Sequence, residues 1–184
     1  MDNVGICNLA LQRLGARSIS SLEDDSTAAR ECNRVFAHAR DSELRAYQWN
    51  FARARVSIAA SSTPPAFGFA NRFPLPSDCL RILPQRDVTD WQIEGRYILT
   101  NDKAPLQLIY LKSVTDPNEF DSLFTELFVS RIAYDICEKI TQSNSKKAEA
   151  KDRYEMAMAR ARKIDSFESI PKEAPTSSWD TARL

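Results

Sequence analysis

The chain has 184 residues, of which 43% are hydrophobic and 27% charged, and this length is enough for one domain around one hydrophobic core. Its 25 Lys and Arg balance 25 Asp and Glu, which argues against nucleic acid as the main partner, because free-standing nucleic-acid-binding proteins are normally basic. No run of eighteen apolar residues occurs and the first residues contain no basic segment, so we expect neither a membrane span nor a signal peptide.

The first third of the chain has two stretches with helical spacing of apolar residues. Residues 4–14 carry apolar side chains on one side, and Gly15 offers a C-terminal cap. The sequence Ser-Leu-Glu-Asp at 21–24 resembles a capping box, so a second helix is expected from there to about Tyr47. Its apolar side is formed by Ala28, Cys32, Val35, Phe36 and Ala39.

The segment from 49 to 55 alternates aromatic and basic residues. Trp49 and Phe51 stand beside Arg53 and Arg55, an arrangement that could contact nucleic acid or an acidic partner. An extended segment with the aromatic rings in the core and the arginines in solvent accounts for the same alternation. We therefore favour the second interpretation.

The middle third has the pattern of short strands. The sequence Ser-Ser-Thr-Pro-Pro at 61–65 breaks any helix, and residues 67–73 then alternate Phe with small or polar residues, as on a half-buried strand. Glu-Gly at 94–95 has the composition of a two-residue hairpin turn, and residues 106–110 alternate again. This pattern predicts a small antiparallel sheet inserted between helices at about 64–112.

A third helix is predicted from Asp121, whose side chain suits an N-cap. Apolar residues cover more than one face of it as far as Ile140, so this helix should be buried nearly all round, in the core or against another subunit. The residues that we consider for a subunit interface are Phe124, Leu127, Phe128 and Ile132.

A last helix follows the polar break at 141–145. It has one narrow apolar stripe opposite a charged face, formed by Ala150, Tyr154, Ala157, Ala161 and Ile164. The predicted fold is therefore α+β and mainly α. We expect a bundle of about four helices with the small β insertion, in a single domain over residues 1–168.

Residues 169–184 contain two prolines, several Ser and Thr, and no helical period, which predicts an extended C-terminal tail. The tail carries Trp179, Arg183 and Leu184. Because Trp and Arg are the commonest hot-spot residues of interfaces, we interpret it as a segment that docks on a neighbouring protein. The alternative is a tail that folds back on its own domain.

Residues typical of catalytic and metal sites are few. The only histidine, His38, lies inside the second predicted helix, where a surface position is expected. Glu23, Asp24 and Asp25 could act as acid and base on a glycan, but capping and the helix dipole account for them. We expect no catalytic residue, metal or cofactor. The cysteines have no metal-ligand spacing and are interpreted as small core residues in a reducing compartment, in preference to disulfides or ligands: Cys7, Cys32, Cys79 and Cys137.

Several short pieces, in a fixed order, carry a resemblance to a known family. They are NLALQRLG at 8–15, SLEDDS at 21–26, RDSEL at 40–44, WNFAR at 49–53, FPLPSDCLRI at 73–82 and SWDTAR at 178–183. In these pieces the chain resembles the tail tubular protein A family of short-tailed bacteriophages, also called head-tail adaptor or gatekeeper-ring proteins. The resemblance runs over most of the chain.

The resemblance implies a helical bundle with a small β insertion and a structural role in the virion, without enzymatic activity. Family members form a ring, typically of twelve copies, at the head-tail junction between the portal protein and the tail nozzle protein. The genome DNA passes through the channel without sequence-specific binding, and the C-terminal tail reaches along the portal. We expect the isolated protein, made in the bacterial cytoplasm, to be largely monomeric and to assemble on the portal. The alternatives are a virion-associated peptidoglycan hydrolase and, third, a nucleic-acid-binding regulator.

Overall fold

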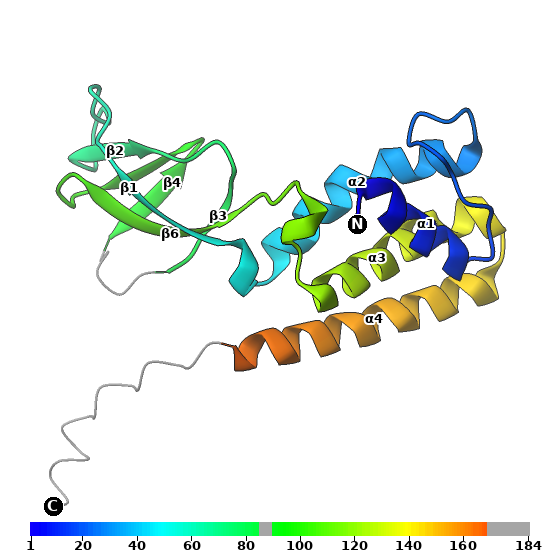
Figure 1. The fold of residues 1–184 in the computed structure, drawn as a ribbon. Coiled ribbons are helices and arrows are strands. Elements are labelled where there is room, and N and C mark those ends of the chain that lie inside the picture. Colours follow the sequence, from blue (N-terminus) through cyan, green and yellow to red (C-terminus); the bar gives the residue numbers. More distant parts are fainter. Residues whose placement is uncertain (85–89, 169–184) are drawn as a thin grey trace, which may run out of the picture.

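The computed structural model describes residues 1–84 and 90–168 and shows an α+β fold in which a helical lobe and a β lobe lie side by side (Figure 1). The predicted docking residues Trp179, Arg183 and Leu184 lie outside the described residues, as does the whole tail 169–184.

The four predicted helices are confirmed. They are α1 (Asn3–Arg13), α2 (Thr27–Ala46), α3 (Ser122–Thr141) and α4 (Asn144–Phe167). Each begins at a side chain that accepts a backbone N–H of the first turn, which satisfies one of the donors that a helix start leaves open. These N-caps are Asp2, Ser26, Asp121 and Ser143.

The C-terminal end of α1 and the start of α2 were both predicted from short local patterns, with different outcomes. Gly15 has φ +72°, and the N–H groups of Gly15 and Ala16 donate to the carbonyls of Gln12 and Leu11, so the predicted glycine cap is confirmed. The predicted capping box at 21–24 is wrong. Helix α2 starts later, at Ser26, because the Asp24 carboxylate accepts the N–H groups of Ser20 and Ser21 and closes a separate turn.

Within residues 1–84 and 90–168, the β lobe contains two antiparallel three-stranded sheets, with strand orders β1-β6-β3 and β2-β5-β4. Side chains of both sheets share one hydrophobic cluster, which is separate from that of the helical lobe. The predicted hairpin is present one residue later, since Gly95 and Arg96 join β4 to β5. The strands are β1 (Arg53–Ile58), β2 (Asn71–Pro74), β3 (Cys79–Ile82), β4 (Trp91–Glu94), β5 (Tyr97–Thr100) and β6 (Leu106–Lys112).

The β region is larger than the predicted small insertion at 64–112. It begins at β1, before the Pro64-Pro65 break, and β1 pairs with β6 from Arg53↔Leu111 to Ile58↔Leu106. This pairing joins residues about fifty positions apart, so no local pattern could reveal it. The predicted strand over 67–73 is also shorter, because residues before Asn71 belong to a loop.

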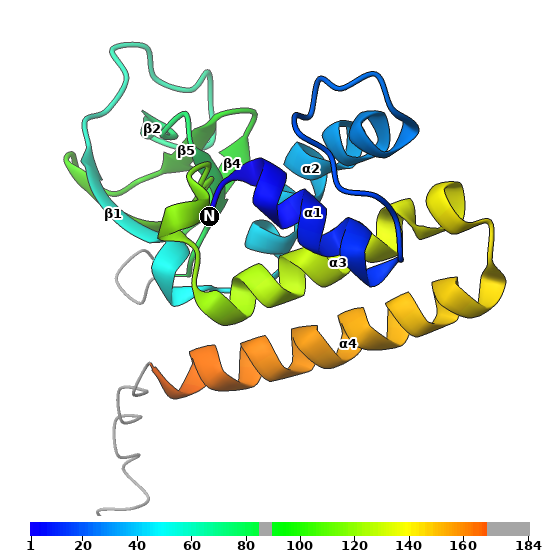
Figure 2. The same ribbon diagram turned by 45° about the vertical axis from the view of Figure 1, so that its right-hand side comes forward.

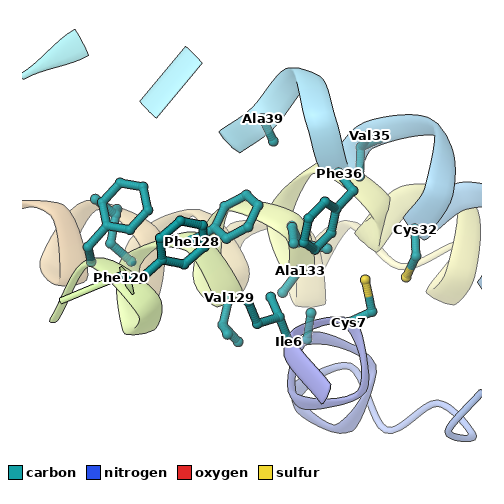
Figure 3. Close-up of a cluster of buried hydrophobic side chains, with 14 of the residues drawn as sticks. Ile6, Cys7, Cys32, Val35, Phe36, Ala39, Phe120, Phe128, Val129 and Ala133 are labelled. Atoms are coloured by element: carbon teal, nitrogen blue, oxygen red, sulfur yellow. The ribbon is translucent and has the colours of Figure 1, made fainter. Parts of the chain in front are cut away.

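Helix α3 occupies the centre of the helical lobe, and α1, α2 and α4 all pack against it (Figures 1 and 2). Phe124, Leu127, Phe128 and Ile132 are fully buried within this single chain. Figure 3 shows Phe128 close to Phe36 of α2, and the two ring centroids are 5.1 Å apart. The expectation of a subunit interface at these four residues is therefore corrected: their surface is already covered by the other helices, and they form the core.

Candidate protein-binding surfaces

Helix α4 lies along the outside of the helical lobe (Figure 2). Ala150 and Ala161 of the predicted stripe are buried, but Ile164 at the end of that stripe is 42% exposed. Beside it Asp165 is buried instead and accepts the N–H of Asn50 at 2.9 Å, while the Asn50 side-chain amide donates to the Asp165 carbonyl at 2.7 Å. Burial raises the pKa of Asp165. These bonds hold the end of α4 against the short 3-10 helix η1 (Asn50–Ala52).

One face of α4 presents large apolar side chains to solvent. Met156 is 64% exposed and Phe167 is 72% exposed, and together with Arg160 and Ile164 they follow at helical spacings that place them on one face. We call these four residues the α4 stripe. Three large apolar side chains on one exposed helix face are unusual for a surface that remains in water, because each leaves apolar area unburied.

A groove of about 320 Å³ runs beside the α4 stripe, between α4, α3 and the end of α1. Arg13 lines it and donates to Ser130 and Glu126 at 2.6 Å, while Met156 and Ala157 supply apolar surface. From Met156 to Ile164 the helix carries Arg and Lys but no acidic residue. Met and Arg are enriched in protein interfaces, so this surface suits a partner with apolar and acidic side chains.

A second exposed apolar feature is the loop of residues 59–70, between β1 and β2. Its two ends are fixed, since Ser61 N–H donates to the Arg72 carbonyl at 2.8 Å and Ala70 N–H donates to the Asn101 side chain at 2.9 Å. Near its tip Phe67 is 89% exposed, followed by Gly68 at φ +87°, a conformation that glycine adopts without strain.

A groove of about 480 Å³ lies between this loop and the sheet β2-β5-β4. It is lined by Pro64, Phe67 and Phe69 of the loop and by Arg72 and Tyr97 of the sheet, where the Arg72 guanidinium stacks 4.7 Å from the centre of the Tyr97 ring. The loop stands at the upper edge of both ribbon views, whereas α4 runs along the lower edge (Figures 1 and 2). The loop 59–70 and helix α4 therefore lie at opposite edges of the molecule in these two views.

A buried polar cluster fixes α4 to the rest of the helical lobe. Glu43 of α2 has only 3% of its side chain exposed, and its carboxylate accepts from Arg131 of α3 at 2.8 Å and from the Tyr154 hydroxyl of α4 at 2.7 Å. Arg131 also pairs with Asp135 at 2.8 Å. Burial, and then the hydrogen bond to Glu43, raise the pKa of Tyr154. The spacing of charged residues in the sequence did not reveal this cluster, because its members come from three helices.

The acidic residues that were considered for glycan hydrolysis are each paired with residues in or beside the turn before α2. Hydrogen bonds from Ser20 and Ser21 lower the pKa of Asp24, which keeps it ionised, whereas a general acid needs a raised pKa. Asp25 pairs with Arg30 at 2.5 Å, and Glu23 accepts from the Ser21 hydroxyl. The turn before α2 accounts for the whole group.

The aromatic and basic residues of 49–55, the histidine and the cysteines all have positions that the structure defines. Trp49 is buried and donates from its indole N–H to the Glu43 carbonyl, and Phe51 packs against the helical core, so neither ring is free to stack on a nucleic-acid base. Arg53 and Arg55 are exposed on β1, as expected. His38 lies on the exposed side of α2. All four cysteines are buried and free, as predicted for small core residues.

No protein-family model matches the chain, and neither does any curated protein. None of the helices over 1–84 and 90–168 is long and apolar enough to cross a membrane. In the same residues, no group of three or more His, Cys, Asp or Glu side chains is placed to hold a metal ion.

Proposed function

We propose that the protein is a structural head-tail adaptor of a short-tailed bacteriophage, whose copies form a ring between the portal protein and the tail nozzle protein. The observation that supports this proposal best is the pair of separate exposed apolar surfaces, the α4 stripe and the loop 59–70, on elements at opposite edges of the ribbon views. An adaptor has to bind two different partners at once, and two separate surfaces meet that requirement. The sequence resemblance supplies the virus and the ring.

The α4 stripe is assigned to the portal side. The described residues end at Glu168, directly after Phe167, which is the last residue of the stripe. The resemblance implies that the tail that follows reaches along the portal. Trp179, Arg183 and Leu184 would then extend the contact that Met156 and Phe167 begin. A tail that orders on docking loses conformational entropy at that moment, so the preformed helix face contributes affinity that the tail alone would lack.

The loop 59–70 is assigned to the nozzle side. Phe67 at its tip has the properties of an anchor residue, since it is large, apolar and held on a loop whose two ends are hydrogen-bonded. The buried cluster around Glu43 and the core around α3 make the helical lobe a rigid body, which keeps the α4 stripe in a fixed orientation.

The ring needs a heterologous contact between neighbouring copies, in which two different faces of the chain meet and the rotation closes. Because the core residues of α3 are not available for it, surface residues make this contact. We expect the isolated protein to be largely monomeric, with the portal as the template for assembly. The genome DNA would pass through the central channel without sequence-specific contacts, consistent with a chain of zero net charge.

Two crossed variants test the proposal. Met156→Asp with Phe167→Asp should abolish binding to the cognate portal protein, and with it ring assembly, measured by co-sedimentation and particle electron microscopy. Phe67→Asp should permit ring assembly on the portal and abolish nozzle binding. Each variant is the control for the other, because all three residues are exposed and the fold should tolerate the changes.

Unchanged circular dichroism and Tm would verify that both variants are folded. The assignment of surfaces is wrong if both variants bind both partners as the unmodified protein does. The adaptor proposal itself is wrong if the unmodified protein forms no complex with the portal at micromolar concentration. Loss of the ring on deletion of residues 175–184 would support the docking role of the tail, and an intact ring after this deletion would contradict it.

A further inference from the structure

The fold brings together two cysteines that are far apart in the sequence. Cys7 lies on α1 and Cys32 on α2, and both are fully buried in the same hydrophobic cluster. Figure 3 shows their sulfur atoms in the space between the two helices, pointing toward one another. Helices α1 and α2 both pack against α3, and this arrangement holds the two cysteines face to face.

Because both sulfurs face the same space, a mixed disulfide formed on either cysteine can be resolved by the other.

We propose that Cys7 and Cys32 form an intramolecular disulfide that covalently joins α1 to α2 when the protein meets a low-molecular-weight disulfide. In the first step one of the two thiols, as its proton leaves to solvent or base, attacks one sulfur of the small disulfide and displaces a small thiolate. In the second step the sulfur of the other cysteine, as its proton leaves, attacks the protein sulfur of the mixed disulfide and displaces the second small thiolate. The two protein thiols lose two protons and two electrons, and the small disulfide is reduced to two small thiols.

Access to the pair requires movement of α1. Both sulfurs are buried, and α1 is held at its C-terminal end by Arg13, which donates to Ser130 and Glu126, and by Lys146, which donates to the Leu14 carbonyl at 3.0 Å. Local opening of α1 therefore limits the rate of oxidation in the native protein. A variant that weakens this hold, Arg13→Ala, should oxidise faster at the same concentration of oxidant.

The cross-link has a physical consequence for the chain. It closes the segment from Cys7 to Cys32, which reduces the entropy of the unfolded state and should raise Tm by about 10 °C. When the disulfide forms in the life cycle depends on the proposed function. A virion protein stays reduced in the bacterial cytoplasm and meets small disulfides and oxygen only after cell lysis. The disulfide itself does not depend on that function.

The test uses the full-length isolated protein, without portal or nozzle, incubated under native conditions with excess oxidised glutathione and then alkylated in denaturant. Tryptic mapping should show one cross-link, between peptides Met1–Arg13 and Glu31–Arg34, with Cys79 and Cys137 alkylated. The double variant Cys79→Ala with Cys137→Ala is the matched control and should form the same cross-link.

Cys7→Ser should form no cross-link and should retain, at most, one glutathione on Cys32. The Tm of the oxidised unmodified protein should exceed that of the reduced form and return on addition of dithiothreitol. The proposal is overturned if Cys7 and Cys32 of the unmodified protein stay alkylatable after the treatment, or if they link to Cys79 or Cys137. Because no partner protein is present, either result leaves the adaptor proposal untouched.

Discussion

Replacement of Arg131 by methionine should destabilise the helical lobe strongly, because it leaves a buried carboxylate without its cationic partner. Arg131 of α3 contacts Glu43 of α2 at 2.8 Å, and the Glu43 side chain is almost wholly shielded from water. Methionine has a similar length and fills the same space, so Arg131→Met isolates the loss of charge from the loss of packing.

The magnitude follows from the burial of the two partners. Loss of one member of a buried ion pair costs on the order of 3–5 kcal/mol. The Arg131 side chain is 23% exposed, so water reaches the vacated space in part and the lower end, about 3 kcal/mol, is expected. For a chain of this size that is a fall in Tm of about 6–12 °C.

A second substitution should change the free energy of unfolding in opposite directions in the unmodified protein and in the Arg131→Met variant, which makes the test specific. Glu43→Gln removes the negative charge but keeps an oxygen that accepts from the Tyr154 hydroxyl. It should destabilise the unmodified protein by about 1–2 kcal/mol, since the ion pair is lost, and it should stabilise the Arg131→Met variant by a similar amount, since the unpaired charge is removed.

Urea unfolding followed by circular dichroism measures all four free energies of the cycle. Arg153→Met is the matched control. Arg153 pairs with Glu149 at 2.7 Å, both side chains are more than half exposed, and the cost should be below about 0.5 kcal/mol. Equal effects of Glu43→Gln in the two backgrounds would refute the reasoning, because they would mean that the two charges do not interact.

Two further outcomes are expected. Burial, with the charge and hydrogen bond of Asp78, raises the pKa of Tyr110 to about 12, so the contribution of this residue to stability is complete below the unfolded pKa of about 10 and is lost as pH rises toward 12. Tyr110→Phe should remove that part of the pH dependence in unfolding experiments between these limits; an unchanged pH dependence would count against it. Phe124→Ala should cost about 3–5 kcal/mol, because the ring is fully buried, whereas Phe67→Ala should change the free energy of unfolding by less than about 0.5 kcal/mol. Similar urea midpoints for these two variants would contradict the burial assigned to them.

The helices are the part of this protein that its sequence determines most directly. Apolar spacing and caps such as Asp121 and Gly15 each act within a few residues of the helix that they define. These local patterns in the sequence therefore located all four helices. The start of α2 was misplaced, because Asp24 could cap either a helix or the preceding turn. Both options satisfy the same kind of hydrogen bond, and only the path of the chain decides between them.

The tertiary structure decided everything that depends on which surfaces meet. An apolar face such as that of Phe124 and Phe128 has the same pattern whether it packs on its own helices or on another subunit, and here its own chain covers it. Conversely, Phe67 belongs to the alternating pattern that predicted a half-buried strand. It is almost fully exposed, because strand β2 begins to pair with β5 only at Asn71.

The same limit applies to polar and reactive groups. Glu43, Arg131 and Tyr154 meet from three helices, and Cys7 meets Cys32 across two. The sequence by itself determined the residue types, their local periodicity and the balance of charge. The folded chain alone determined the distances between residues remote in sequence, and ion pairing, thiol chemistry and exposed binding surfaces depend on those distances because their interactions act over a few ångströms.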